Sequence, residues 1–392
     1  MRIAYLLGSL NRGGTETLLL DVFKNAGKSN LDAVGIYRKS GVLESNFLEN
    51  DMPMYKVPTG KNTIGFIFQL RKLLLENSVT IVHAQQPIDA LYAWLACAGT
   101  GIKVILTFHG YDFDESILGR LIIWFIIKRT VGNVFVSEAQ LKHYQQKYHL
   151  NPDNQQVVCN GISFEKLEVS DIWRATLSSN IPVTDSCTKV VSPYTLQKEL
   201  HLSSDTLLLG SVGNFVSGRD QLTLCRFLKL LNQQNLNFHF VFVGKRTDNE
   251  PQLYDDCVRF CEQNKLSDRV SFLGLRKDVP MILNELDAFI YATNHDTFGI
   301  AVVEAMAVGI PVFVNDWGVM SEITENGKYA TLYKTKDEND LLQQFMLFLQ
   351  NKAIYQVKAK NAALFVRERY SIEKHIEALK VVYNKMINTD LR

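Results

Sequence analysis

The 392-residue sequence predicts an α/β protein with two doubly wound domains, each built on a parallel sheet that helices cover. Short apolar runs rich in β-branched and aromatic residues recur along the chain, and stretches with helical patterning separate them. The length and the 46% hydrophobic content suit two cores, since a domain usually takes ~100–200 residues.

The expected strands form two groups. The first group is RIAYLL (2–7), TIVHAQ (80–85), KVILTFHG (103–110) and NVFVS (133–137). The second group is TLLLGSVG (206–213), HFVFVG (239–244), RVSFLG (269–274), AFIYAT (288–293) and IPVFVN (310–315). A polar, Ser/Thr-rich stretch interrupts this pattern before 206, and helical patterning dominates after 338. We therefore expect a first domain at 1–165, a connector at 166–205, a second domain at 206–370 and a last helix at 371–392.

Charge and cysteine usage exclude several classes of protein. A formal net charge of +1 gives no electrostatic reason to expect a nucleic-acid partner. The cysteines fit neither a zinc site nor a CxxC redox pair, and the N-terminal residues lack a signal-peptide pattern. We expect reduced core thiols in a cytoplasmic protein. The cysteines are Cys97, Cys159, Cys187, Cys225, Cys257 and Cys261.

The segment ILGRLIIWFIIKR, Ile117 to Arg129, is the most membrane-like part of the chain. Arg120 interrupts its apolar run, which is also shorter than the ~20 residues needed to span a bilayer. Two interpretations stay open. The segment is either a buried helix or an interfacial helix that docks on a membrane through Trp124 and the flanking Lys128 and Arg129.

Ligands of open parallel sheets bind at the carboxyl ends of the strands, so the loops there matter most. GSLNRGGTE (8–16) is a glycine-rich loop before a helix, which suits phosphate, although tight turns explain glycines equally well. Gly14 stands where a P-loop needs its lysine, and there is no GxGxxG. His109 ends KVILTFHG, where it can contact a ligand or be a structural imidazole.

The second domain has a similar glycine loop, GSVGNFVSGRDQ (210–221), which contains Arg219. Lys245 and Arg246 follow the next expected strand. Together these residues offer backbone amides and positive charge to a diphosphate, whereas each basic residue alone also suits a solvated surface position.

The stretch NHDTFGIAVVEAMAVGIPVFV (294–314) carries two acids around the start of a short apolar helix that should end at Gly309. Asp296 lies in the loop before the helix, and Glu304 lies inside it among apolar neighbours. A carboxylate in that position needs a partner, either a structural Lys or Arg or a ligand hydroxyl. An N-cap role explains Asp296 and leaves Glu304 unexplained.

Six motifs together resemble the retaining glycosyltransferases of family 4, which have the GT-B fold. They are GGTE (13–16), TFHGYD (107–112), NGI (160–162), VGN (212–214), SFLG (271–274) and DTFGIAVVEAMAVGIPV (296–312). The resemblance implies two Rossmann-like domains that face each other across a cleft, with the last helix crossing back onto the first domain. It also implies transfer of a sugar from a nucleotide-diphosphate sugar to an acceptor hydroxyl with retention, and no bound metal or other cofactor.

The resemblance assigns roles to individual residues. Asp296 and Glu304 match the family's E-x7-E motif, with the first acid one methylene shorter. They would bind the hydroxyls of the donor sugar and the ribose, respectively. The other implied donor contacts are the amides at Thr297, Phe298, Gly299 and Ile300, His109 near the transferred sugar, Gly13 and Gly14 near the diphosphate and acceptor, and Leu275 and Arg276 near the base.

One departure from the family lies in the phosphate site. The family usually has Arg directly after VG and Lys a few residues on, whereas this chain has Asn214 first and Ser217 or a shifted Arg219 second. Negative charge builds on the leaving diphosphate, so we expect Arg219 and Lys245 to replace the usual pair.

Two alternatives to the transferase stay open. Paired carboxylates also serve glycoside hydrolases, and Asn214 with the shortened acid is compatible with a non-catalytic nucleotide-sugar-binding subunit. For a transferase we expect a sugar or lipid-linked sugar as acceptor, in bacterial-type surface polysaccharide or glycolipid synthesis. The expected location is the cytoplasm, and peripheral contact with the inner face of the membrane through Ile117 to Arg129 stays open.

Overall fold

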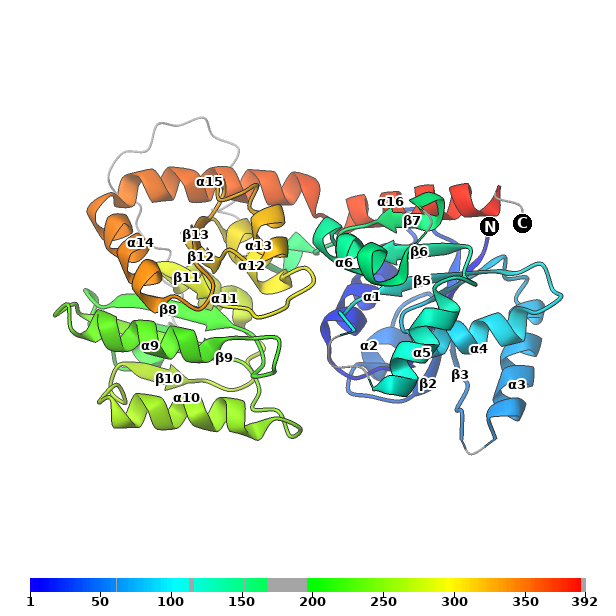
Figure 1. The fold of residues 1–392 in the computed structure, drawn as a ribbon, viewed down its shortest axis with the longest axis horizontal. Helices are drawn as coiled ribbons and strands as arrows, with labels where there is room; N and C mark the ends of the chain where they lie inside the picture. The colour runs from blue at the N-terminus through cyan, green and yellow to red at the C-terminus, as the bar shows by residue number, and fades with distance from the viewer. Residues whose placement is uncertain (61, 113–115, 151, 168–195, 389–392) are drawn as a thin grey trace. The chain divides into compact units, whose positions relative to one another are not determined.

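The computed structural model describes residues 1–60, 62–112, 116–150, 152–167 and 196–388 (Figure 1). The chain forms two compact units, Met1–Ile162 with Tyr370–Arg392, and Ser163–Arg369. Each unit is a parallel sheet between helices. The predicted fold class, with two doubly wound parallel-sheet domains, is confirmed.

The first unit holds a seven-stranded parallel sheet in the order β3-β2-β1-β4-β5-β6-β7. Its strands are β1 (Ile3–Ser9), β2 (Ala33–Lys39), β3 (Met54–Lys56), β4 (Ile81–Ala84), β5 (Lys103–Phe108), β6 (Gly132–Phe135) and β7 (Gln155–Val157). Its helices are α1 (Gly14–Asn25), α2 (Glu44–Leu48), α3 (Thr63–Glu76), α4 (Pro87–Cys97), α5 (Ile117–Ile126), α6 (Glu138–Tyr148), the 3₁₀ helix η1 (Pro152–Asn154) and α16 (Ile372–Ile387). The strand order reverses direction between β1 and β4, which makes that point the sheet's topological switch.

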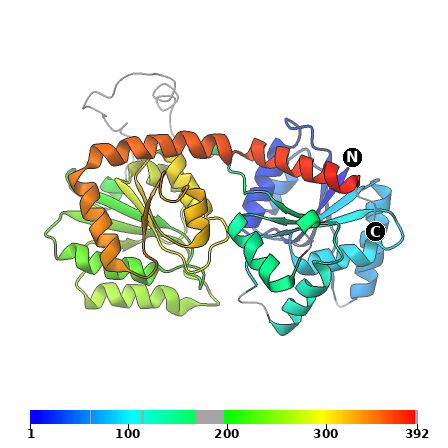
Figure 2. The same cartoon turned by 45° about the horizontal axis from the view of Figure 1, so that its top comes forward.

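Alternating side chains of the first sheet feed cores on its two faces. Tyr5 and Ile105 pack with α1 and α16 on one face. Leu6 and Leu106, one residue further along the same strands, face the opposite core, which α3, α4, α5 and α6 cover. The last helix, α16, therefore completes the first unit, and Figure 2 shows it in red.

The second unit holds a six-stranded parallel sheet in the order β10-β9-β8-β11-β12-β13, with its switch point between β8 and β11. Its strands are β8 (Leu207–Val212), β9 (Phe238–Val243), β10 (Val270–Phe272), β11 (Ala288–Tyr291), β12 (Val312–Asn315) and β13 (Thr331–Tyr333). Its helices are the 3₁₀ helix η2 (Phe164–Leu167), α8 (Leu196–Glu199), α9 (Gln221–Asn232), α10 (Pro251–Gln263), α11 (Val279–Glu285), α12 (Ile300–Val308), α13 (Gly318–Ile323), α14 (Glu338–Gln350) and α15 (Lys352–Arg369).

All the predicted strands are present, and the structure adds β2, β3, β7 and β13. Three of these are only 3 residues long, which is too short for a periodic signal. In β2 the pattern is interrupted by Gly35, where an added Cβ would lie 2.2 Å from Met54 Sδ. Close packing between β2 and β3 thus explains a glycine that sequence patterns count against a strand.

The boundaries between the units differ slightly from the expected ones. The first unit ends at Ile162, so the predicted limit at 165 falls within η2 of the second unit. Of the predicted connector, 168–195 lies outside the described residues, and the rest belongs to the second unit. The predicted last helix is α16, which the Ser371 hydroxyl caps by accepting from Lys374 N.

The cysteines that the structure describes carry free thiols. Cys97, Cys225, Cys257 and Cys261 are buried, and Cys159 is half-buried. The expectation for Cys187 falls outside the described residues.

The buried-helix interpretation of 117–129 is wrong for one side of α5. Ile123 and Ile126 are buried, whereas Ile117, Leu118, Leu121 and Trp124 are 54–82% exposed. Among the helices described, none is long and apolar enough to cross a membrane.

Candidate functional site

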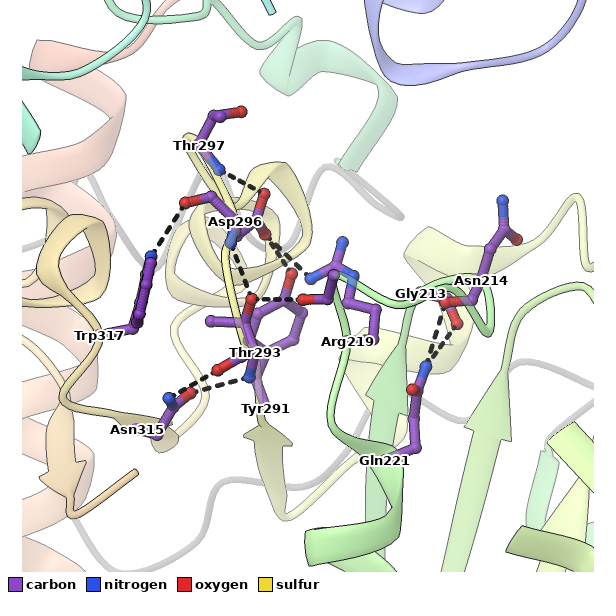
Figure 3. A network of polar contacts seen from close by, with 11 residues as sticks. Gly213, Asn214, Arg219, Gln221, Tyr291, Thr293, Asp296, Thr297, Asn315 and Trp317 are labelled. Carbon is purple, nitrogen blue, oxygen red and sulfur yellow. Dashed lines mark hydrogen bonds and ion pairs between the residues drawn. The ribbon is translucent and has the colours of Figure 1, made fainter. Parts of the chain in front are cut away.

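The loops after β8 and β11 meet at the switch point of the second sheet and bring two predicted residues together. Arg219 Nη1 donates to Asp296 Oδ2 at 3.0 Å, across 77 positions of sequence (Figure 3). Each side chain is only 19% exposed. Asp296, the predicted sugar-binding residue, and Arg219, the predicted phosphate-binding residue, therefore form one ion pair. The pair lies where sheets of this type bind ligands.

Tyr291, the last residue of β11, completes this pair. Its hydroxyl donates to Asp296 Oδ2 at 2.5 Å, and the Arg219 guanidinium carbon lies 4.4 Å from its ring centroid. Tyr291 is buried, with 1% exposure. In the sequence Tyr291 is one residue of the expected strand AFIYAT, and its hydroxyl at the strand's carboxyl end is the only signal of a further role.

Three polar residues that sequence analysis missed hold the backbone of this loop. Thr293 Oγ1 accepts from Asp296 N at 2.9 Å and donates to Gly218 O at 2.7 Å. The Asn315 amide bonds both Thr293 N and Thr293 O at 2.9 Å, and Trp317 Nε1 donates to Asp296 O at 3.3 Å (Figure 3). These bonds fix the loop before any ligand arrives.

The N-cap interpretation of Asp296 is wrong. Its Oδ1 accepts from Thr297 N at 2.9 Å, but the residue that caps α12 is Gly299, with φ 88°. A Cβ on Gly299 would lie 2.7 Å from Met320 Cε, so both the space and the left-handed backbone require glycine. The first amides of α12 have no intrahelical carbonyl to bond, which leaves a helix N-terminus beside Asp296.

Glu304 lies just over one turn inside α12. It is half-buried, whereas the residues from Ala301 to Val308 on either side of it are buried. Phe298, which precedes Gly299, is also buried and anchors the start of the helix in the core. The structure thus leaves Glu304 access to the surface from an otherwise apolar helix, and its ribose contact stays a prediction.

Asn214, which stands where the resemblance implies an arginine, orders the glycine loop after β8. Its Oδ1 accepts from Lys245 N at 2.9 Å, and its backbone O accepts from Gln221 Nε2 at 3.1 Å. A Cβ on Gly244 would lie 2.0 Å from Gly213 O, so glycine is required where the loops after β8 and β9 touch. Asn214 is exposed, and its hydrogen bond to Lys245 connects these two loops.

The other predicted basic residues pair with acids. Lys245 Nζ lies 3.0 Å from Asp248 Oδ2 in an exposed pair. Arg276 bonds Glu199 at 2.6 and 3.0 Å and Asp278 at 2.8 and 2.6 Å. Arg276 thus ties α8 to the loop after β10, and its contact with a base stays a prediction. The adjacent Leu275 is 62% exposed, as an apolar platform for a base must be.

In the first unit, the predicted residues lie at the carboxyl ends of β1 and β5. Gly13 is the N-cap of α1 and Gly14 its first residue. His109 Nε2 is 2.8 Å from Gln85 Oε1, which follows β4. Burial, with a smaller effect of nearby His375, lowers the pKa of His109 to about 3, so the imidazole is neutral at pH 7.

Side chains of helix α6 hydrogen-bond the loop that follows His109 and hold it in place. Gly110 O accepts from Gln140 Nε2 at 2.9 Å and from the Tyr144 hydroxyl at 3.1 Å. Two residues on, the fully buried Asp112 binds three more side chains of α6. These are His143 Nε2 at 2.9 Å, Lys147 Nζ at 2.6 Å and the Tyr148 hydroxyl.

The contacts of Asp112 explain the last residue of the TFHGYD motif. Burial raises the pKa of Asp112, but the hydrogen bonds from Lys147, Tyr148 and His143 outweigh it and bring the pKa to about 2. Asp112 is therefore an ionised anchor for the His109 loop, a role that sequence analysis missed. Within the described ranges, no group of three or more His, Cys, Asp or Glu residues is arranged to hold a metal ion.

Two models of known protein families match this chain. A model described as "Glycosyl transferases group 1" matches residues 195–364, and one described as "Glycosyltransferase Family 4" matches residues 12–166. The chain belongs to the group 1 glycosyltransferases of family 4. This glycosyltransferase is thus an enzyme of the hexosyltransferase type, and the predicted family is confirmed.

Individual relatives are distant but cover most of the chain. The glycosyltransferase is 21% identical to the UDP-Gal:alpha-D-GlcNAc-diphosphoundecaprenol alpha-1,3-galactosyltransferase of Escherichia coli over 95% of this chain and 94% of the relative. It is 21% identical to the N-acetyl-alpha-D-glucosaminyl L-malate synthase of Bacillus anthracis over 82% and 79%, respectively. The crystal structure of Anabaena HepE in complex with UDP superposes with a TM-score of 0.82 at 17% identity, over 98% of this chain and all of the other, which supports the GT-B fold.

Proposed function

We propose that this glycosyltransferase moves a sugar from a nucleotide-diphosphate sugar to an acceptor hydroxyl, with retention at the anomeric carbon. The observation that carries the proposal is the Arg219–Asp296 pair at the switch point of the second sheet, beside the N-terminus of α12. In this proposal Asp296 orients the hydroxyls of the donor sugar, and Glu304 binds the ribose. Complexes of Anabaena HepE with UDP and with UDP-glucose support such a donor for a protein of this fold.

The proposed reaction uses no metal cofactor. Arg219 brings a guanidinium with N–H groups beyond the one that Asp296 accepts, and the α12 amides add a positive helix end. These donors would stabilise the charge that builds on the leaving diphosphate. For retention, we propose attack from the face that the diphosphate leaves, with Asp296 orienting the sugar and not acting as a nucleophile.

The geometry favours this transferase over the glycoside hydrolase. Asp296 Oδ2 accepts from both Arg219 and Tyr291, so this carboxylate oxygen is already bonded to side chains of the neighbouring loop and strand. A hydrolase would also leave the ordered glycine loops after β8 and β9 without a ligand. The non-catalytic alternative differs from the transferase in turnover and is decided by the same assay.

The stereochemical prediction can be checked by proton NMR of the reaction. Purified enzyme is incubated without metal with UDP-, GDP- and ADP-sugars and a panel of sugar and lipid-linked acceptors, and the anomeric coupling constant of the product is measured. We expect the α configuration to persist when the donor is α-linked. An inverted product contradicts retention. Sugar release from glycosides without nucleotide supports the hydrolase, and donor binding without turnover supports the non-catalytic subunit.

We further propose a membrane-attached acceptor, reached from the cytoplasmic face through α5. The exposed side of α5 carries Leu121 and Trp124, and Lys128 Nζ lies 4.8 Å from the Trp124 ring. Arg129 packs on Phe125 at 4.3 Å, and the helix itself contains no acidic residue. An apolar stripe with a basic end suits an anionic bilayer surface. The lipid-linked substrate in the name of the E. coli relative supports this choice. The L-malate in the name of the B. anthracis relative supports a soluble acceptor instead.

Vesicle sedimentation can decide between a membrane-attached acceptor and a soluble one. We expect the protein to sediment with phosphatidylglycerol vesicles and not with phosphatidylcholine vesicles. Replacing both Leu121 and Trp124 by Ala should weaken binding at least tenfold, because each buries apolar area worth about 1.5–3 kcal/mol. Val381→Ala on α16, another exposed apolar position, is the matched control. Equal sedimentation of the α5 variant and the wild type would contradict the membrane contact.

A further inference from the structure

A buried polar chain lies behind His109 in the first unit. His83, with 1% exposure, pairs its Nδ1 with the Tyr383 hydroxyl at 2.7 Å and its Nε2 with Thr107 Oγ1 at 2.6 Å. The Tyr383 hydroxyl is in turn 2.8 Å from that of Tyr5. Because both ring nitrogens are hydrogen-bonded in the core, the position of His83 and of its backbone carbonyl is fixed.

Gln85 connects this chain to His109. Its side chain lies between the ends of β4 and β5 and is 5% exposed. Its Nε2 donates to His83 O at 3.2 Å, and its Oε1 faces His109 Nε2 at 2.8 Å. A backbone carbonyl can only accept, so the amide nitrogen must face His83 and the amide oxygen must face His109. An amide oxygen also only accepts, so His109 Nε2 carries the proton and Nδ1 carries the lone pair.

We propose that Gln85 is a positioning residue that holds His109 in its neutral Nε2–H form, so that Nδ1 acts as a hydrogen-bond acceptor in the reaction. The functional part rests on the proposed function and on the role that the family resemblance implies for His109, near the transferred sugar. A histidine held in this way can accept from a sugar hydroxyl, but it brings neither charge nor a proton for the leaving diphosphate. His109 would then orient the sugar and take no part in acid–base chemistry.

The surroundings of His109 support a neutral ring. The titratable side chains that line the small enclosed space beside it are Tyr5, His83 and His375, and no carboxylate lines it within the described part of the chain. Burial lowers the pKa of His83 to about 3 and that of His375 to about 4. Protonating any one of these imidazoles would disfavour protonation of the others.

Nitrogen-15 NMR of histidine-labelled enzyme tests the positioning directly, because long-range proton–nitrogen spectra separate the two tautomers. A His109→Gln variant assigns the signal. We expect wild-type His109 as the Nε2–H tautomer, without titration between pH 5 and 8. Gln85→Leu should give a mixture of tautomers and lower kcat/KM about tenfold, the value of one hydrogen bond. Gln85→Glu should place a carboxylate on Nε2 and bring the titration of His109 above pH 5.

Gln86→Leu, at the exposed neighbouring glutamine, is the matched control and should leave the His109 signal unchanged. An Nδ1–H tautomer in the wild type, or an unchanged His109 signal in both Gln85 variants, would overturn the proposal. The readout is independent of turnover. If the tautomer shifts while no donor is ever turned over, the positioning stands and the proposed function fails. If turnover is found and the tautomer does not respond, the positioning fails alone.

Discussion

Replacing Asp296 by alanine is expected to lower kcat about 100- to 1000-fold, the size of effect seen when one preorganised group that contacts the reacting centre is removed. The variant loses the acceptor for the sugar hydroxyls, and it leaves Arg219 and Tyr291 without the oxygen that they share. Steady-state kinetics with the donor identified by the NMR assay measures this loss, and thermal unfolding checks that the protein is folded.

Two further variants make the Asp296 experiment specific. Asp248→Ala removes the carboxylate that pairs with Lys245. The Asp248 side chain is 84% exposed, and the change should leave kcat within about twofold because exposed pairs contribute little. Asp296→Glu restores the usual family residue but should also lower kcat, because the longer side chain has to displace Arg219. A kcat for Asp296→Ala close to that of the wild type would contradict the sugar-binding role.

Replacing Arg219 by methionine is expected to lower kcat/KM about 100-fold. The change keeps an unbranched side chain but removes the charge that we assign to the diphosphate, and it leaves Tyr291 as the remaining side-chain donor to Asp296 Oδ2. The comparison variant is Lys245→Met, whose loss should be several-fold smaller, because Lys245 lies in an exposed pair with Asp248. Kinetics on both variants gives the ranking.

This pair of variants decides which basic residue replaces the family's usual Arg and Lys. A larger loss for Lys245→Met than for Arg219→Met would show that the diphosphate lies over the loop after β9. Equal activity of Arg219→Met and the wild type would mean that the Arg219–Asp296 pair only holds the loop. Either result would assign the phosphate site to other residues and would leave the description of the fold unchanged.

The fold was readable from the sequence because strands buried on both faces leave continuous apolar runs, as in AFIYAT and HFVFVG. The last family motif also placed Asp296 and Glu304 correctly around the start of α12. Local pattern was sufficient there because the loop, helix and following strand are contiguous in the chain.

The pairing within the site was not readable, because it depends on strand order. Arg219 reaches Asp296 since β8 and β11 are neighbours in the sheet, although β9 and β10 come between them in sequence. The ring of Tyr291 is buried in the core, and only the position of its hydroxyl in the structure reveals its contact with Asp296. The partners of Asp112 likewise lie on α6. Local sequence patterns do not show that this helix packs against the loop after β5.

The most direct test of the central claim, a nucleotide-sugar site built around α12, is isothermal calorimetry of the wild type and Glu304→Ala with UDP, GDP and ADP in the absence of metal. We predict that one nucleotide binds the wild type and that its Kd rises about 10- to 100-fold in the variant, which loses the charged hydrogen bonds to the ribose. Glu368→Ala, an exposed acid of α15, serves as the control and should bind like the wild type. Absence of binding to a folded wild type, or equal binding to Glu304→Ala, would contradict this account.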